Sequence, residues 1–261
     1  MTRRRWIADE FSGDRAALTG AHAAHLSRTL RARVGQQFEV ACGKQLRRAT
    51  VFSVEDERVE FTLSEEVAAR QAVPITLLLA VFKFDRMEWA IEKCTELNVT
   101  TILPVIARRT EKHLALAADK RVERWRRIAR EAAEQSRRIA PPEIADPVKL
   151  KEALAKLHAR NSPAVIPSEG FSASSGTRVR PGCDLRIVLA ENGSEATLSE
   201  VLRARDDVTS LALAVGPEGG WTTEDLQLFK LSQWLAASLG DTILRAETAA
   251  ISAVAIARAW C

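Results

Sequence analysis

The sequence predicts an α/β fold with two domains, a small β-rich one over residues 1–70 and a larger one over residues 74–261. In the first domain, short apolar runs are separated by turns. Beyond Pro74, apolar runs of strand length alternate with segments of helical spacing. Repeated strand-helix-strand units favour a mainly parallel sheet covered by helices on both faces.

Three strands are expected in the first domain. They are Phe38–Cys42, Ala49–Val54 and Val59–Leu63. Gly43-Lys44 and Glu55-Asp56-Glu57 supply the turns between them, and residues 68–73 are the expected linker to the second domain.

Strands and helices are expected to alternate through the second domain. The expected strands are Ile75–Phe82, Val99–Ile106, Arg186–Ala190, Leu211–Val215 and Trp234–Leu239. Helices are expected through Met87, Ala90, Ile91, Cys94 and Leu97, from Val122 to a stop near Pro141-Pro142, and near Glu195–Arg203, Thr222–Lys230 and Ala246–Trp260. Residues 161–184, rich in Ser, Pro and Gly, are expected to form a loop.

Composition argues against several classes of protein. The 261 residues are 46% hydrophobic and 28% charged, which suits a packed core. The apolar runs are far shorter than the roughly 20 residues of a membrane-spanning helix, and no apolar signal core follows the N-terminal arginines. The four cysteines form no Cys-x-x-Cys pair, and no carboxylate or cysteine cluster accompanies the histidines. We therefore expect a cytoplasmic protein without a metal site.

Positive charge is concentrated in two segments. Residues 1–48 carry ten Lys or Arg against four Asp or Glu, and residues 108–138 carry eleven against five. Two separated basic surfaces suit a polyanion that is held at two places. A solvated helix face is an equally good explanation of the second segment.

The strongest local feature is a glycine-rich turn after an expected strand. Gly216-Pro217-Glu218-Gly219-Gly220 follows Leu211–Val215, and a capping box from Thr222 to Asp225 starts the next helix. Ligands of open α/β sheets bind outside the carboxyl ends of the strands, and glycines let the backbone approach them closely. The turn matches neither Gly-x-Gly-x-x-Gly nor a phosphate loop. A plain strand-to-helix turn remains the alternative.

A second glycine junction runs from Ser238 through Leu239-Gly240 to Arg245 and Glu247. It also joins a strand to a helix, so the two turns together provide a floor for a flat ligand. Arg245 and Glu247 have the alternative of being a solvated pair at a helix start.

A third cluster, Glu131-Ala132-Ala133-Glu134-Gln135-Ser136-Arg137-Arg138, places polar groups at a helix end before two prolines. These groups are suited to reach a partner or substrate, or the arginines merely complement the helix dipole.

Six segments in order along nearly the whole chain resemble the bacterial ribosomal RNA small subunit methyltransferase E family. They are His25-Leu26-x-Arg28-x-Leu30-Arg31, Phe82-Lys83-Phe84-Asp85-Arg86-Met87, Lys93-Cys94-Thr95-Glu96-Leu97, Glu131 to Arg138, Gly216 to Gly220, and Leu239-Gly240 through Leu244-Arg245-x-Glu247-Thr248-Ala249. Two positions depart from the family pattern. Asn98 stands where the family has glycine, and Thr242 stands where it has the first arginine of Leu-Gly-x-Arg-Ile-Leu-Arg.

The resemblance implies a PUA-like β-barrel at the N-terminus for RNA and a C-terminal SPOUT domain whose chain end forms a deep trefoil knot. It also implies a homodimer with an active site built from both subunits. The implied reaction is transfer of a methyl group from S-adenosylmethionine to N3 of a uridine in 16S rRNA of the small ribosomal subunit.

The resemblance places the cofactor against three loops that follow strands. The expected cofactor-binding residues are Leu189, Ala190, Glu191, Val215, Gly216, Pro217, Glu218, Gly219, Leu239, Gly240, Ile243, Leu244 and Thr248. The expected RNA-binding residues are Arg3, Arg4, Arg5, His25, Arg28, Arg31, Lys83 and Arg86.

The chemistry of the reaction suggests the catalytic residues. Uracil N3 is a weak acid, so methyl transfer needs the loss of its proton or a cation that stabilises the developing anion. We expect Arg245 and Arg138 to supply that charge, and Glu247 or Glu218 to position groups or accept the proton.

Two other classes of protein remain open at this point. The Thr242 departure allows a non-catalytic RNA-binding or ribosome-assembly factor with the same fold. A doubly wound nucleotide enzyme such as a dehydrogenase is disfavoured because no strand is followed by Gly-x-Gly-x-x-Gly.

Overall fold

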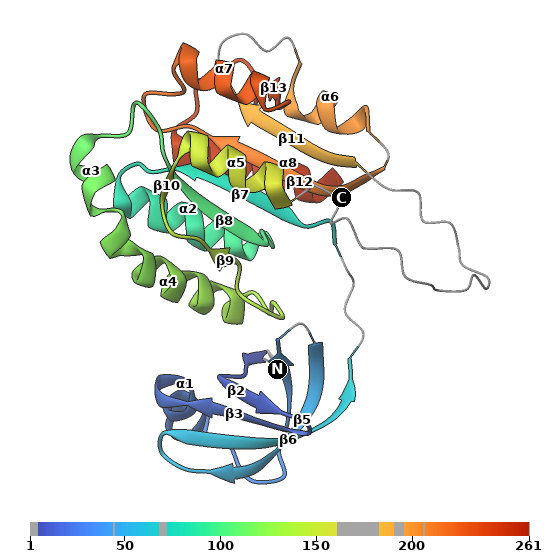
Figure 1. The fold of residues 1–261 in the computed structure, drawn as a ribbon. Helices are drawn as coiled ribbons and strands as arrows, with labels where there is room; N and C mark the ends of the chain where they lie inside the picture. Colours follow the sequence, from blue (N-terminus) through green and yellow to red (C-terminus); the bar gives the residue numbers. More distant parts are fainter. Residues whose placement is uncertain are drawn as a thin grey trace, which may run out of the picture. The chain divides into compact units, whose positions relative to one another are not determined.

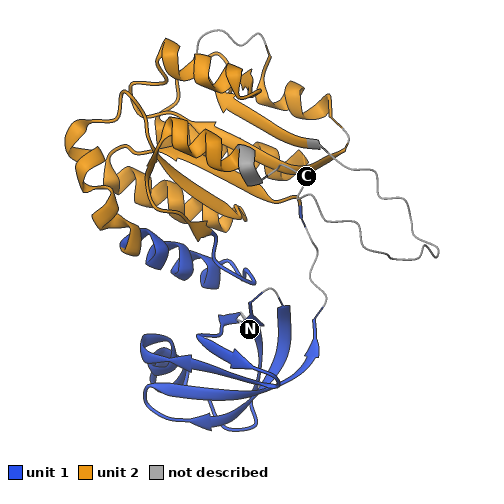
Figure 2. Cartoon of the chain, viewed as in Figure 1, with its two compact units in different colours: residues 1–72, 124–142 blue, residues 73–123, 143–261 orange. Residues whose placement is uncertain are grey.

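A computed structural model describes residues 5–43, 45–67, 72–160, 183–190, 196–205 and 207–260. Most of the expected loop at 161–184 lies outside these residues, as do Arg3, Arg4 and Glu191. The chain forms two compact units (Figure 2), residues 1–72 with 124–142 and residues 73–123 with 143–261. The first unit thus contains a stretch of the chain beyond the N-terminal region, the greater part of helix α4 (Val122–Gln135).

The first unit is built on a six-stranded sheet with the order β1-β4-β5-β6-β3-β2 (Figure 1). Its strands are β1 (Trp6–Ile7), β2 (Glu10–Ser12), β3 (Arg15–Thr19), β4 (Gln37–Cys42), β5 (Gln45–Val54) and β6 (Arg58–Glu66). The three strands expected from sequence are confirmed as β4, β5 and β6. The short strands β1 to β3 were not predicted, nor were helix α1 (Gly20–Ala24) and the π-helical turn η1 (His25–Thr29) that continues it.

A buried carboxylate attaches α4 to this sheet unit. The Glu134 side chain is 1% exposed, and its Oε1 lies 3.3 Å from Nε2 of His22 and 3.4 Å from Nε of Arg130. Arg130 in turn donates a hydrogen bond of 2.7 Å to Asp9. Ala133, beside Glu134, packs in a small apolar cluster with residues of β1, β4 and β5. Because a buried charge is costly unless it is paired, these contacts explain why residues 124–142 belong with the first unit.

Helix α4 ends at Gln135, several residues before the expected stop at the prolines. Arg137 adopts a left-handed backbone with φ 59°, and the N–H of Arg138 donates to the carbonyl of Ala133 at 2.9 Å. This pattern closes a helix and satisfies carbonyls that lack an intrahelical partner. The prolines are therefore not needed to stop the helix.

The second unit contains a parallel sheet with the order β10-β8-β7-β12-β11-β13, and β9 pairs with β8. Its strands are β7 (Ile75–Ala80), β8 (Thr101–Ile106), β9 (Glu143–Ile144), β10 (Val148–Lys149), β11 (Cys183–Leu189), β12 (Val208–Val215) and β13 (Leu235–Ala237). Every pairing is parallel, which confirms the expected strand arrangement.

Helices cover both faces of this sheet (Figure 1). The helical elements of the unit are α2 (Phe84–Glu96), α3 (Lys112–Ala117), the 3₁₀ turn η2 (Asp119–Arg121), α5 (Leu150–Arg160), α6 (Leu198–Arg203), α7 (Thr223–Leu231) and α8 (Ala246–Trp260). α5 and α7 share one apolar cluster with the strands, whereas α8 packs with α2 and α6. No described helix has the length and apolar content to cross a membrane.

The start of α7 matches its sequence expectation, and the end of α2 shows how the chain accommodates Asn98 in place of the family's glycine. At the start of α7, the Asp225 N–H donates to the Thr222 hydroxyl at 3.1 Å and the Thr222 N–H donates to the Asp225 carboxylate at 3.2 Å. The expected capping box is thus confirmed. After α2, Asn98 has φ 65°, so asparagine supplies the left-handed residue for which glycine is the usual choice.

The Cys94 thiol gives a test of how tightly α2 packs. Burial raises its pKa from 9.0 to about 12, and alkylation requires the thiolate. We expect native protein treated with iodoacetamide near pH ~9 to keep the Cys94 peptide unmodified, because at that pH thiolate accumulates only where the side chain is unfolded. Urea-unfolded protein, modified under the same conditions, is the control for peptide mass spectrometry. Equal labelling of both samples would contradict the buried position.

Candidate functional site

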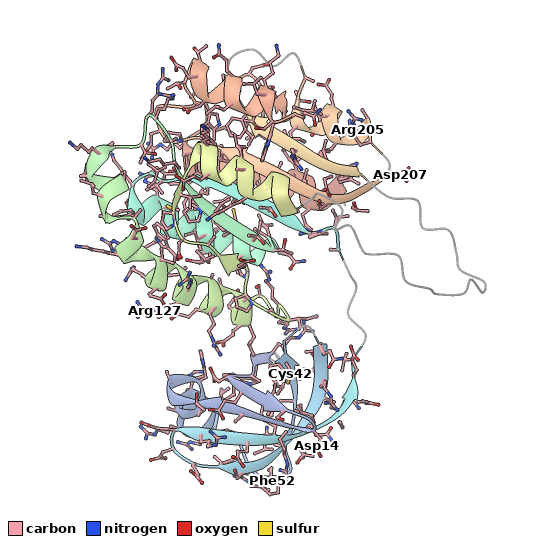
Figure 3. The ribbon with its side chains drawn as sticks, viewed as in Figure 1. Asp14, Cys42, Phe52, Arg127, Arg205 and Asp207 are labelled. Atoms are coloured by element: carbon pink, nitrogen blue, oxygen red, sulfur yellow. The ribbon has the colours of Figure 1, made fainter. Side chains whose placement is uncertain are left out.

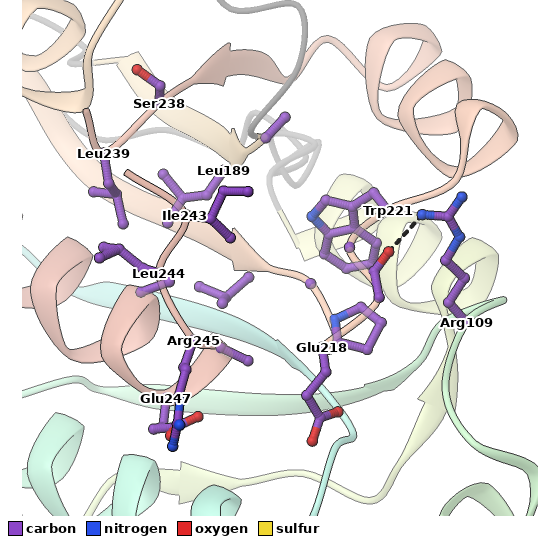
Figure 4. Close-up of a pocket in the computed structure, with 18 of the residues that line it drawn as sticks. Arg109, Leu189, Glu218, Trp221, Ser238, Leu239, Ile243, Leu244, Arg245 and Glu247 are labelled. Carbon is purple, nitrogen blue, oxygen red and sulfur yellow. Dashed lines mark hydrogen bonds between the residues drawn. The ribbon is translucent and has the colours of Figure 1, made fainter. Parts of the chain in front are cut away.

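Segments that follow the carboxyl ends of five strands enclose a cavity of about 690 Å³ in the second unit (Figure 4). These segments follow β7, β8, β11, β12 and β13. Parallel strands bring their carboxyl ends to one edge of a sheet, which is where ligands of such sheets bind. The volume lies in the range of roughly 300–1,000 Å³ typical of small-molecule sites.

The cavity brings together most of the residues expected to form the site. From the expected sets, its lining includes Leu189, Ala190, Val215, Gly216, Pro217, Glu218, Gly219, Leu239, Gly240, Ile243, Leu244, Arg245, Glu247, Lys83 and Arg86. Thr248 is not part of the lining. Arg138, Arg5, His25, Arg28 and Arg31 lie in the first unit.

The turn after β12 requires glycine at specific positions. The Gly220 N–H donates to the Pro217 carbonyl at 2.8 Å, and Gly220 has φ +69°. A Cβ on Gly216 would lie 3.3 Å from Nε1 of Trp221. The turn can therefore fold this tightly beside the cavity only because side chains are missing.

Neighbouring segments hold this turn at two points. The Lys83 N–H donates to the Glu218 carboxylate at 3.3 Å. Arg109 donates from Nη1 to the Gly219 carbonyl at 2.5 Å, as Figure 4 shows. Arg109 was not expected from the sequence, because an arginine three residues beyond a strand in a basic segment has no motif of its own.

The second glycine turn contributes an apolar wall. Gly240 has φ +121°, which favours glycine. Leu239, Ile243 and Leu244 are drawn on one side of the cavity in Figure 4, opposite Trp221 and Arg109. Ile243 is 81% exposed, an unusual exposure for an isoleucine, and this suits a surface that a ligand covers.

The charged groups of the cavity fall into two kinds. Glu247 is 3% exposed and forms an ion pair with Arg86, so its partner is a residue of α2 rather than Arg245. The Arg245 side chain is exposed at the cavity and makes no ion pair with any residue that the structure describes. Arg245 is thus available to a ligand, whereas Glu247 is not a solvated charge.

Electrostatics at the start of α7 are also favourable to a carboxylate. Hydrogen bonds from its own backbone N–H and from Thr222 lower the pKa of Glu224, with smaller contributions from Arg108 and Arg109. The helix dipole also stabilises negatively charged side chains in the first turn of a helix.

Two of the expected RNA-binding arginines in the first unit have acidic partners. Nη2 of Arg28 lies 3.1 Å from Oδ2 of Asp56, and Nη2 of Arg5 lies 3.2 Å from Oε2 of Glu39. Arg48 likewise pairs with Glu65, so acids between residues 55 and 66 offset part of the positive charge that the first 48 residues carry. Exposed ion pairs of this kind contribute little stability and exchange partners readily.

Two further expected RNA-binding residues have local structural roles. The His25 ring lies 6.0 Å, centroid to centroid, from the buried ring of Trp6. Arg31 has φ 50° and closes the helical turn, since the Ala32 N–H donates to the Leu26 carbonyl at 3.1 Å. Its side chain is exposed and is not ion-paired within the described part of the chain.

Comparison with known proteins agrees with this geometry. Residues 69–258 match the RNA methyltransferase domain family. The ribosomal RNA small subunit methyltransferase E of Synechocystis sp. is 30% identical over 239 residues, which cover 91% of this chain and 71% of that protein. The enzyme of the same name from Mycobacterium bovis is 30% identical over 250 residues, 93% of this chain and 86% of its own.

A solved structure is similar over almost the whole chain. The ribosomal RNA small subunit methyltransferase E of Neisseria gonorrhoeae, crystallised with S-adenosylmethionine, is 28% identical, covers 97% of this chain and 95% of its own, and superposes with a TM-score of 0.75. The fold, the glycine turns and these similarities agree, and the chain belongs to the RNA methyltransferases of the ribosomal RNA small subunit methyltransferase E family.

Proposed function

We propose that the protein methylates ribosomal RNA of the small subunit with S-adenosylmethionine, and that the modified atom is N3 of a uridine in 16S rRNA. The observation that supports this most directly is the cavity between two glycine turns, with the exposed guanidinium of Arg245 in its lining. The family provides the reaction class, and the Neisseria gonorrhoeae relative is a protein of this family with the cofactor bound.

The residues present suit the cofactor. The backbone groups of the Gly216–Gly220 turn can pair with the edge of an adenine, and Leu239, Ile243 and Leu244 offer apolar walls to its faces. Leu189 and Ala190, at the end of β11, close the same cavity. Glu191 and Thr248 remain part of the proposed set, the first outside the described residues and the second outside the lining.

The chain's own groups must manage the proton and charge of the uracil. When bound, the cofactor supplies a methyl group already activated on a sulfonium. N3 must lose its proton as the new N–C bond forms, and Arg245 is placed to stabilise the negative charge that develops on the base. Glu218 is exposed at the cavity and suited to accept the proton. Glu247, buried against Arg86, is suited to position that arginine.

The finer features of fold and assembly belong to the same proposal. The six-stranded sheet supports a PUA-like barrel for RNA in the first 70 residues. The strand order, and the return of the chain from edge strand β13 to α8 against α2 and β12, support a trefoil knot in residues 74–261. Arg138 does not line the cavity, so its charge-stabilising role depends on a homodimer with active sites built from both subunits. A substrate of this kind also implies a cytoplasmic location.

The first prediction of this proposal concerns the reaction itself. Unmodified small ribosomal particles, incubated with the protein and S-adenosylmethionine labelled in the methyl group, should acquire label in 3-methyluridine. Nucleoside mass spectrometry after digestion identifies the product. Label in another nucleoside would contradict the N3 assignment but keep the reaction class, whereas failure to bind the cofactor at all would favour the non-catalytic factor that Thr242 leaves open.

A second prediction isolates Arg245. Arg245→Ala should lower kcat about 10²- to 10³-fold, as expected for removal of a group that stabilises developing charge. Its affinities for cofactor and RNA should change little, as measured by calorimetry and filter binding. Arg203→Ala, in the last turn of α6 and outside the cavity, is the matched control. A full methylation rate in Arg245→Ala would rule out this role.

A third prediction concerns the RNA contacts of the first unit. RNA affinity should fall as salt rises, because arginine contacts to phosphates release counterions. Arg31→Ala should reduce the slope of log K against log salt by about 0.7 to 0.9, the contribution of one phosphate contact. The slope should be unchanged in Arg203→Ala. An unchanged slope in Arg31→Ala would remove Arg31 from the RNA interface.

A further inference from the structure

Arg109 is held on a rigid loop at the edge of the cavity. The loop follows β8, and its closing residue, Thr110, accepts a hydrogen bond of 3.1 Å from the Ala107 N–H through its hydroxyl. The same hydroxyl donates to the Val81 carbonyl at 3.2 Å, which joins the loop to the segment after β7. The Thr110 N–H also donates to the Ala107 carbonyl at 3.1 Å. The backbone that carries Arg109 is therefore fixed to two strand ends of the sheet.

The Arg109 side chain contacts the glycine turn with both its polar and its apolar parts. The guanidinium donates to the Gly219 carbonyl at 2.5 Å. A Cβ on Gly219 would lie 3.3 Å from Cδ and 3.5 Å from Cβ of Arg109, so the aliphatic stem lies directly against the glycine. Gly219 is residue three of the turn that the Gly220 N–H closes onto Pro217.

Arg108, the residue before Arg109, contacts the other end of the stretch from Gly219 to Asp225. Nε of Arg108 lies 3.6 Å from the carboxylate of Asp225, which is 2% exposed and belongs to the capping box of α7. Consecutive arginines of one loop thus contact both ends of the stretch from Gly219 to Asp225. A loop that merely exposes positive charge to solvent would not make these two contacts.

We infer that Arg109 is a positioning residue that fixes the Gly216–Gly220 turn in the conformation that binds the cofactor, by holding the carbonyl of Gly219. This inference rests on the proposed function, because the ligand of the turn is taken to be S-adenosylmethionine. In this role Arg109 acts through the turn and not on the reacting atoms. Its loss should loosen the turn and weaken cofactor binding, while the chemical step at saturating cofactor stays close to the original rate.

The first measurement needs no cofactor. Hydrogen-deuterium exchange of the peptide that spans the turn should be about tenfold faster in Arg109→Ala than in the unmodified protein, because the bond from the Gly220 N–H to Pro217 opens more often. Peptides of α2 and α5 should exchange at the same rate in both proteins, which shows that the unit remains folded. Unchanged exchange in the turn would overturn the inference, whatever the protein binds.

The second measurement separates cofactor binding from RNA binding. In Arg109→Ala, the calorimetric Kd for S-adenosylmethionine should rise about tenfold, the effect of one lost hydrogen bond from a charged donor. KM for the cofactor should rise with it, with kcat nearly unchanged. Arg109→Lys keeps a donor and an apolar stem and should recover part of the affinity. Arg205→Ala, an exposed arginine beyond α6 (Figure 3), is the matched control.

The outcomes distinguish this inference from the proposed function. If Arg109→Ala loses RNA affinity and salt dependence while its cofactor affinity is unchanged, Arg109 is an RNA contact and the inference is wrong. If the unmodified protein does not bind S-adenosylmethionine, the proposed function fails, and the exchange measurement alone decides whether Arg109 holds the turn.

A substitution at the other partner tests the contact directly. Gly219→Ala adds a Cβ 3.3 Å from Arg109 Cδ, so the arginine stem must shift by a few tenths of an ångström, which should weaken its hydrogen bond to the Gly219 carbonyl and speed exchange in the turn. In the Arg109→Ala background the same methyl group no longer contacts the arginine stem beyond Cβ. The increase in exchange caused by Gly219→Ala should then be at least about threefold smaller. Equal effects in both backgrounds would show that the two residues are not coupled, contrary to the inference.

Discussion

Parallel pairing in the second unit determines where the groups that line the cavity lie. β12 pairs with β7 on one side and β11 on the other, in registers that join Val215 to Leu79 and Val188 to Ala214. Each of these strands then ends at the same edge of the sheet, and so do β8 and β13. Residues more than 150 positions apart along the chain, such as Lys83 and Arg245, consequently line one cavity.

The same pairing explains why the cavity is lined with backbone as much as with side chains. The central strands β7, β8 and β12 are largely buried on both faces, so most of their positions are taken by apolar residues that form the core. Polar chemistry is left to the segments beyond the strand ends, where the chain must turn sharply and glycine is favoured. The side chains of adjacent segments then fix the turns, as Lys83 and Arg109 do at Glu218 and Gly219.

Only part of this site could be predicted from the sequence, for physical reasons. Apolar periodicity predicted the long buried strands and the helices α2, α4, α6, α7 and α8 because burial imposes it, but α5 was not predicted. The glycine turns were visible because few residues other than glycine fit them. Strands of two or three residues, such as β1 and β2, are too short to show a pattern. The contacts of Arg109 and of Glu134 were not predictable either, because each joins segments brought together only by folding.

Helix α4 contributes residues to both units. Its first two residues belong to the second unit and the remainder to the first, so the chain passes from one unit to the other within a continuous helix. If the chain were divided near residue 70 and the two fragments were separated, the contacts of Glu134 with His22 and of Arg130 with Asp9 would be lost. The apolar cluster around Ala133 would be exposed. The second fragment would then expose the Glu134 carboxylate and the Arg130 guanidinium to water, and their contacts with the N-terminal region would be lost. The polar motif from Glu131 to Arg138 therefore stabilises the N-terminal region, independently of any part that Arg138 takes in the reaction.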